Sequence, residues 1–252
     1  MIPYLPQPVW HIGPLAVPAF GVAVGSALVT GYCMVIARAT AMGVSSLRAG
    51  RIFAVVVLSG LFAGYLWNGG GGMSSTGLAA GSCAGMLACA AAFRSFWTTL
   101  DLFAYPVPLT FAVARTGCFF AHDHVGRNSD SFLAVRFPGG AAYDLGLLYA
   151  LSSAVAAMAI FLVEKRSPSP GVLTGLVLVL LSASRLAILP LGRANLTDYW
   201  FAAAMAMTGV AIIFAKRWPG TRGSPPTLAT IPSPSPDSPA QSKRHRPTST
   251  PK

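Results

Sequence analysis

Residues 102–127 read LFAYPVPLTFAVARTGCFFAHDHVGR, an apolar run that ends in a cluster of charged and titratable side chains. The run is uncharged from 102 to 114, and only 10% of the whole chain is charged. Residues 114–127 nevertheless hold two arginines, one aspartate and two histidines. Arg115 therefore stands where a buried or membrane-embedded segment should still be continuing, and its presence there needs a physical reason.

The composition of the chain points to a lipid environment. The 252 residues are 54% hydrophobic, with a mean hydropathy of +0.59, which is above the apolar share of an ordinary soluble domain. Seven apolar runs approach the length of about 17–25 residues that a helix needs to cross a bilayer. They are continuous and do not alternate, which favours helices over a barrel. The sequence predicts an all-α polytopic membrane protein with about seven transmembrane helices, at 19–37, 52–67, 77–93, 102–121, 145–163, 171–189 and 199–215.

The distribution of basic residues predicts the orientation. With the N-terminus outside and the C-terminus inside, thirteen of the 18 lysines and arginines face the cytoplasm, as the positive-inside rule favours. The net charge of +11 is then explained by topology and by a basic tail, so no nucleic-acid partner is expected. Five arginines lie on the other side or inside helices: Arg115, Arg127, Arg136, Arg185 and Arg193.

Two parts of the chain differ in composition. Residues 1–218 are expected to form the transmembrane domain, and the Pro- and Ser-rich residues 219–252 a disordered basic tail in the cytoplasm. The first residues lack a basic segment, so no cleavable signal peptide is expected. Four cysteines lie in apolar runs without a CxxC pair, which indicates buried free thiols and no metal site: Cys33, Cys83, Cys89 and Cys118.

Arg115 and Arg185 are the arginines that apolar residues surround most closely. An arginine at the centre of a membrane helix costs roughly 2.5–3.5 kcal/mol on insertion scales. No carboxylate lies at helical spacing in either segment, so a local ion pair does not explain them. One interpretation is that the side chains extend to the membrane surface. The other is that they bind an anionic ligand within the bilayer, for which a phospholipid headgroup is the obvious candidate, because guanidinium binds phosphate in a bidentate fork.

A glycine-rich stretch, GGGGMSSTGLAAG at 69–81, separates the second and third runs. Its backbone N–H groups at a helix N-terminus would favour an anion, and Ser74, Ser75 and Thr76 are candidate helix caps. An ordinary turn between two membrane helices explains the same stretch equally well.

Together these segments resemble the prolipoprotein diacylglyceryl transferase family, collinearly from about Ile12 to Phe214. The similar segments are IGPLAVPAFGVAVG near the start, GGMSSTG at 71–77, DLFAYPVPLTFAVARTGCF from Asp101, HDHVGR ending at Arg127, and GVLTGLVLVLLSASR at 171–185. The resemblance implies seven transmembrane helices with a small periplasmic cap in the bacterial cytoplasmic membrane. It also implies transfer of the diacylglyceryl group of phosphatidylglycerol to the lipobox cysteine of a prelipoprotein, with release of glycerol phosphate and without a cofactor. The expected partners are phosphatidylglycerol, prelipoprotein signal peptides and membrane lipids.

The resemblance also assigns expected roles to residues. Arg115 matches an arginine that binds the phosphatidylglycerol headgroup, and Arg185 matches a second essential arginine. Gly126 and Arg127 match the end of a conserved segment, and Gly72 belongs to the glycine-rich motif. These five are the expected substrate-binding residues.

Several positions depart from the family pattern. Thr76 stands where the family has a histidine, and the other departures are Cys118 for asparagine, Phe20 and Leu181 for tyrosines, and Leu189 for an acidic residue. The segment around Tyr143 and Asp144 also differs. His122, Asp123 and His124 are the nearest groups that can replace the missing base, so they and Thr76 are the candidate catalytic residues. An exposed polar loop is the alternative reading of both histidines.

Two other functions remain open from the sequence. One is a catalytically impaired paralogue that binds anionic phospholipid or lipoprotein without turnover, which the missing proton-handling groups suggest. The other is a small transporter, although the sequence shows no inverted repeat.

Overall fold

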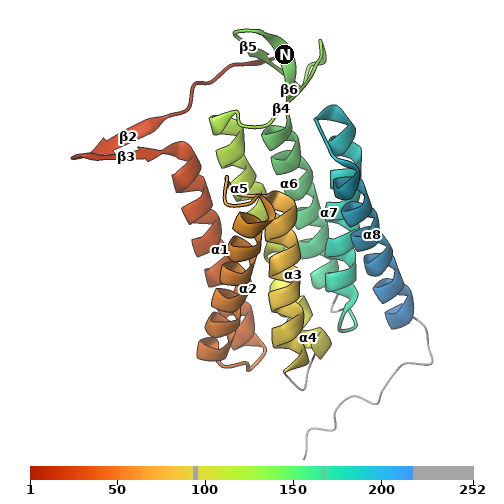
Figure 1. Cartoon of the computed structure of the whole chain (residues 1–252). Coiled ribbons are helices and arrows are strands. Elements are labelled where there is room, and N and C mark those ends of the chain that lie inside the picture. The colour runs from red at the N-terminus through yellow and green to blue at the C-terminus, as the bar shows by residue number, and fades with distance from the viewer. Residues whose placement is uncertain (93–95, 167, 218–252) are drawn as a thin grey trace, which may run out of the picture. The chain divides into compact units, whose positions relative to one another are not determined.

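The computed structural model describes residues 1–92, 96–166 and 168–217, which belong to one compact unit. The predicted tail at 219–252 lies outside the described residues. The fold consists of long helices with a small β-sheet at one end (Figure 1). The helices are α1 (Ala19–Ala41), α2 (Ser46–Trp67), α3 (Ser75–Ala91), α4 (Phe96–Ala104), α5 (Val107–Ala121), α6 (Leu145–Glu164), α7 (Val172–Ile188), the 3-10 helix η1 (Leu189–Leu191) and α8 (Leu196–Arg217).

Six of the seven predicted runs each overlap one long helix, in the expected order. Within the described residues, five segments are long and apolar enough to cross a membrane, namely α1, α2, α6, α8 and α7 extended through η1. Helix α3 is also apolar but has only 17 residues. The expectation of a single span at 102–121 is wrong, because this run is divided between α4 and α5. Pro106 and Pro108 supply no backbone N–H and disfavour helix in the residue before each of them, which places the break at this point.

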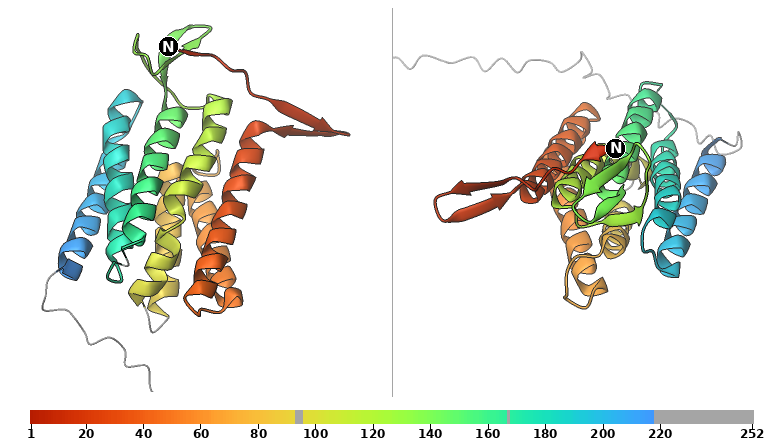
Figure 2. Two further views of the ribbon diagram at one scale, coloured as in Figure 1. Left: turned by 180° about the vertical axis from the view of Figure 1, so that it is seen from behind. Right: turned by 90° about the horizontal axis from the view of Figure 1, so that it is seen from above.

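The helices pack as neighbouring pairs. Helix α2 packs on α3, α7 on α8, and α5 contacts both α1 and α6 (Figure 2). Helices α5 and α7 run towards the sheet, and α6 and α8 run away from it (Figure 1). The ends of α5 and α7 and the beginnings of α6 and α8 therefore lie at the same end of the helices, which we call the cap end.

Glycines on α2 and α3 allow these two helices to pack closely. A Cβ on Gly60 would lie 2.2 Å from Ser82 Oγ, and a Cβ on Gly85 would lie 2.2 Å from Ser59 Oγ. Gly77 and Gly81 lie directly against the backbone of α2, where a Cβ would also be too close. The glycine-rich sequence thus serves helix packing, as small residues do in membrane proteins, in addition to forming a turn.

Replacing Gly81 with alanine is expected to destabilise the protein by about 1–3 kcal/mol through overpacking. The new Cβ would lie 2.4 Å from both Ala63 Cβ and the carbonyl oxygen of Ser59, so α2 would have to move. Thermal unfolding of the detergent-solubilised protein measures the effect. Gly25→Ala is the matched control, since a Cβ there meets open space. Equal unfolding temperatures for the two variants would refute the packing explanation.

The expectation of an all-α chain is wrong at the cap end, where short strands form a sheet. The strands are β1 (Ile2–Pro3), β4 (Val125–Asn128), β5 (Ala134–Phe137) and β6 (Gly140–Asp144), in the order β1-β5-β6-β4. Strand β1 pairs with β5 in parallel, and β6 pairs antiparallel with β5 and β4. Strands of two to five residues are too short to leave a recognisable alternation in the sequence.

A separate hairpin precedes α1. It consists of β2 (Val9–Ile12) and β3 (Leu15–Pro18), paired antiparallel with Val9 opposite Pro18. All four residues of β2 are exposed, and the hairpin extends away from the helices (Figure 1). It carries no Asp, Glu, Lys or Arg.

Candidate functional site

The cap end brings together residues from five helices. Thr76 lies in the first turn of α3, Arg115 in the second half of α5 and Tyr149 near the start of α6. Arg185 lies in the last turn of α7, and Asp198 in the first turn of α8. Residues that are far apart in the sequence thus lie at the same end of the helices.

Arg115 is a buried cation without an acidic partner. Its relative exposure is 6%, and among the residues that the structure describes no carboxylate forms an ion pair with it. Its guanidinium instead faces the Phe111 ring at 4.8 Å and the Tyr149 ring at 4.9 Å, and Nη1 lies 3.9 Å from Cys118 Sγ. Cation–π contacts offset part of the cost of burying the charge, but they do not neutralise it.

Tyr149 lies near both arginines of the site. Its phenol interacts with the charges of both Arg115 and Arg185, and also with Asp198 and Tyr199. Both arginines therefore lie close enough to Tyr149 for their charges to act on this one side chain, although they belong to helices α5 and α7.

Arg185, Thr76 and Asp198 form a hydrogen-bonded network. Arg185 Nη2 donates to Thr76 Oγ1 at 2.6 Å and to Asp198 Oδ1 at 2.9 Å. Thr76 Oγ1 in turn donates to Asp198 Oδ1 at 2.6 Å. As the spacing predicted, no local ion pair explains Arg185; its carboxylate partner comes instead from another helix, α8.

Asp198 is a site residue that the sequence predictions missed. It lies one position before the predicted span at 199–215 and so outside all seven predicted spans. In the structure it lies inside α8, which begins at Leu196. An acidic residue in the first turn of an apolar helix is a signal that could have identified it, because carboxylates are rare in such helices.

The glycine-rich stretch forms the turn from α2 into α3. Gly72 is exposed and has a φ of +136°, a conformation that L side chains rarely adopt. Ser74 caps α3 by accepting a hydrogen bond from Gly77 N at 3.3 Å. Of the three expected caps, Ser74 has this role, whereas the Thr76 side chain is directed to Asp198.

His122 connects the N-terminal segment to the cap. It ends α5 in a left-handed conformation, with Nδ1 2.7 Å from Asp144 Oδ2 and Nε2 2.9 Å from the carbonyl oxygen of Leu5. Its ring also stacks on Tyr4. Burial raises the pKa of the Asp144 carboxyl, and the hydrogen bond to His122 opposes this rise. Because both ring nitrogens are engaged, His122 is not available here to take a proton from a substrate.

The variant His122→Phe is expected to release the N-terminal segment from the cap, because it removes both hydrogen bonds while keeping an aromatic ring against Tyr4. Amide hydrogen exchange of Ile2, Tyr4, Leu5 and Gln7 should then be at least about fivefold faster, a change that corresponds to roughly 1 kcal/mol. His124→Phe is the control, since the His124 side chain is exposed. Unchanged exchange in His122→Phe would contradict this role.

Asp123 and His124 form an exposed pair, with His124 Nδ1 2.5 Å from Asp123 Oδ1. Together with Cys118 they place one ligand atom each within 4.8 Å of one another. The cysteine spacing, from which no metal site was expected, gave no sign of this cluster. Thiolate, imidazole and carboxylate suit zinc, but the Arg115 cation beside Cys118 opposes binding of a divalent ion.

Gly126 and Arg127 lie on β4 at the cap. A Cβ on Gly126 would lie 2.6 Å from the carbonyl oxygen of Leu191, so glycine is required for η1 to pack against this strand. The Arg127 side chain is exposed. The structure therefore gives Gly126 a packing role and brings neither residue into the Thr76–Arg185–Asp198 network.

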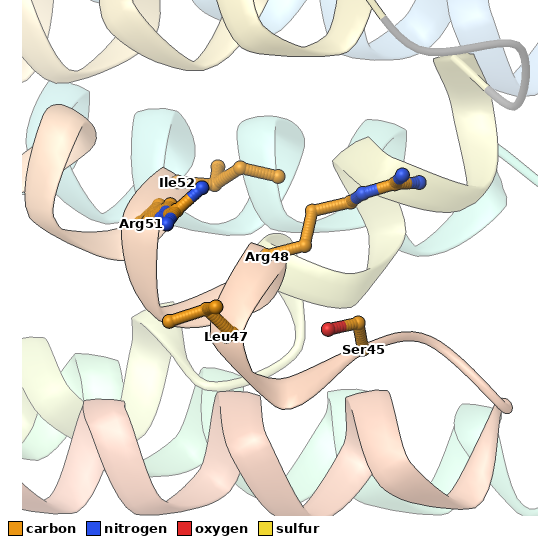
Figure 3. A pocket seen from close by; sticks show the side chains of 5 residues that line it. All are labelled: Ser45, Leu47, Arg48, Arg51 and Ile52. Atoms are coloured by element: carbon orange, nitrogen blue, oxygen red, sulfur yellow. The ribbon is translucent and has the colours of Figure 1, made fainter.

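A hollow at the opposite end of the helices is separate from this site. It is lined by Ser45, Leu47, Arg48, Arg51 and Ile52 at the start of α2, with a volume of about 370 Å³ (Figure 3). Helix α2 runs from this hollow to the glycine-rich turn at the cap end, which separates the hollow from Thr76.

A comparison with known protein families identifies the relationship. The model of the prolipoprotein diacylglyceryl transferase family matches residues 7–215, which is most of the chain. The chain belongs to this family. No curated protein matches the chain significantly. The family is one of transferases in lipoprotein biosynthesis, and the apolar helices agree with a membrane location.

The family match covers all the helices that contribute to the site. Thr76, Arg115, Arg185 and Asp198 all lie within residues 7–215. The residues of the hydrogen-bond network at the cap end therefore lie within the part of the chain that matches the family.

Proposed function

We propose that this protein transfers the diacylglyceryl group of phosphatidylglycerol to the lipobox cysteine of prelipoproteins. Arg115 and Arg185 bind the phosphate of the lipid, and the signal peptide of the prelipoprotein presents its thiol at the cap end. Gly72, Gly126 and Arg127 belong to the surroundings of this site.

The observation that carries the proposal is the buried and unpaired charge of Arg115. A buried cation is stable only where an opposite charge compensates for its lost hydration. The phosphate of an anionic lipid provides that charge at membrane depth, and guanidinium recognises it through paired hydrogen bonds.

The chemistry follows from the position of this charge. The thiol sulfur attacks the glycerol carbon that carries the phosphate, an S–C bond forms, and the C–O bond to phosphate breaks. The electron pair leaves with the phosphate oxygen as glycerol phosphate. The guanidinium groups stabilise the charge that develops on this leaving group, and one well-placed donor of this kind contributes roughly a hundredfold to a thousandfold in rate.

The proposed location is the bacterial cytoplasmic membrane, with the cap end in the periplasm. Arginines and lysines at the opposite end support this orientation: Arg38, Arg48, Arg51, Lys165, Arg166 and Lys216. The lipobox thiol of an exported prelipoprotein would then reach the cap end from the periplasmic side.

Rescue of a bacterial strain depleted of its own transferase tests the proposal. Expression of the wild-type chain should restore growth and lipoprotein maturation, whereas Arg115→Ala should not. Absence of rescue by a correctly inserted protein would favour the alternative, a paralogue that binds lipid without turnover. Thr76 supports this alternative, because it stands where the family has a histidine that could serve as a base.

A further inference from the structure

The Thr76–Asp198 pair contains one of two positions that bear on how this chain departs from the family pattern near Arg185. Thr76 replaces a histidine, and Leu189 replaces an acidic residue expected one turn after Arg185. The structure places a different carboxylate, Asp198 of α8, within hydrogen-bond distance of both Thr76 and Arg185. The acidic group beside Arg185 therefore comes from α8 and not from the turn that follows Arg185.

The hydrogen bonds of Thr76 leave one acceptor position on its oxygen. A hydroxyl group has one donor and two lone pairs. Thr76 Oγ1 gives its proton to Asp198 Oδ1 at 2.6 Å and accepts one bond from Arg185 Nη2, also at 2.6 Å. One lone pair remains for a donor that comes from a substrate, and an S–H group is such a donor.

Arg185 keeps donors for an anion while it holds this pair. Its Nη2 serves Thr76 and Asp198, whereas its Nε is buried and has no hydrogen-bond partner among the described residues. A buried N–H without a partner is costly. The same guanidinium can therefore orient the proton acceptor through one edge and bind a phosphate oxygen through another.

We propose that Thr76 and Asp198 form a proton relay for the incoming lipobox thiol. This inference rests on the proposed function. As sulfur attacks the glycerol carbon, the thiol proton moves to Thr76 Oγ1, and the hydroxyl proton of Thr76 moves to Asp198. The S–C bond forms, the C–O bond to phosphate breaks, and Asp198 holds the proton until it is returned to solvent or to the released phosphate.

The relay gives the thiol proton an acceptor in a chain that lacks the family histidine. A threonine hydroxyl is a poor base by itself, but its short bond to a carboxylate allows it to pass a proton on while it receives another. The groups that face Asp198 are the Thr76 hydroxyl on α3, the Arg185 guanidinium on α7 and the backbone N–H of Asn195. Tyr149 on α6 is the next titratable group, and the charge of Asp198 acts on its phenol.

The test compares two substitutions of Thr76 in the purified full-length protein, with phosphatidylglycerol vesicles and a lipobox peptide. Thr76→Val removes the hydroxyl but keeps the shape of the side chain and the Arg185–Asp198 ion pair. Its kcat should fall by about a hundredfold or more, with an unchanged KM for phosphatidylglycerol. Thr76→Ser restores the hydroxyl and should recover activity to within about tenfold of the wild type.

The pH profile distinguishes a relay from a structural role. Without a proton acceptor, Thr76→Val depends on thiolate that is already formed, so its rate should rise about tenfold per pH unit below the thiol pKa of about 8.5. The wild-type rate should rise less steeply. Asp198→Asn should show the same steep profile. Thr208→Val, which removes an exposed hydroxyl elsewhere on α8, should behave like the wild type.

The outcomes separate the relay from the proposed function. If the wild-type protein transfers no diacylglyceryl group, the proposed function fails and the relay fails with it. If the wild type is active and Thr76→Val keeps its kcat and pH profile, the relay alone is wrong. An inactive Thr76→Ser that is folded like the wild type would also overturn the relay.

Discussion

Replacing Arg115 with alanine is expected to reduce diacylglyceryl transfer by roughly a hundredfold to a thousandfold, the usual effect of removing a group that stabilises transition-state charge. Arg115 is 6% exposed, and its guanidinium faces two aromatic rings and a thiol with no ion-pair partner among the described residues. Its positive charge is thus available to a ligand. The rate of lipidation of a lipobox peptide, followed by mass spectrometry, measures the effect.

A second substitution separates loss of charge from loss of fold. Arg115→Met keeps an unbranched apolar side chain against Phe111 and Tyr149, so it should also be inactive but should unfold at a temperature no lower than the wild type. This follows because replacing a buried unpaired charge with an apolar group is often stabilising. Arg136→Ala on the exposed side of β5 is the control and should keep full activity. An active Arg115→Met would contradict the role of the charge.

Asp101→Ala is expected to destabilise the protein by about 3 kcal/mol, since it removes hydrogen bonds to a charged acceptor and a helix cap together. Asp101 of α4 is 6% exposed and accepts from Gly171 N at 2.6 Å, Thr174 N at 2.8 Å and Thr174 Oγ1 at 2.6 Å. Gly171, at the N-cap of α7, has no side chain to do this. The carboxylate also faces the positive end of that helix.

Thermal unfolding in detergent measures this effect. Asp101→Asn keeps one acceptor oxygen and should be intermediate, whereas Asp130→Ala in the exposed cap loop should unfold like the wild type. If Asp101→Ala and Asp130→Ala unfold at the same temperature, the cap from α4 does not stabilise α7.

The positions of the long helices follow from the sequence because a bilayer imposes a minimum length on each apolar segment. The spans at 19–37 and 145–163 lie within α1 and α6. The location of Arg115 and Arg185 at one end also follows, since successive spans alternate in direction. In both cases the length and order of the apolar segments, which are visible in the sequence, determine where a residue lies.

Three features could not be predicted in this way. Asp198 reaches Thr76 across 122 residues, and no local spacing encodes such a contact. The bonds of His122 to Asp144 and Leu5 depend on a sheet whose strands are too short to leave a pattern. Pro106 and Pro108 permit a break between α4 and α5, but a continuous apolar run of spanning length does not show whether such prolines kink a helix or end it.

The most direct measurement is the transfer of label from lipid to peptide by the purified protein. Vesicles would contain diacylglycerol-labelled phosphatidylglycerol or, in a parallel sample, phosphatidylethanolamine with the same acyl chains. We expect the cysteine of a lipobox peptide to gain one diacylglyceryl group from phosphatidylglycerol, with loss of this product in Arg115→Ala. No labelled peptide, or equal labelling by wild type and Arg115→Ala, would contradict the view that a buried guanidinium holds the lipid phosphate for transfer.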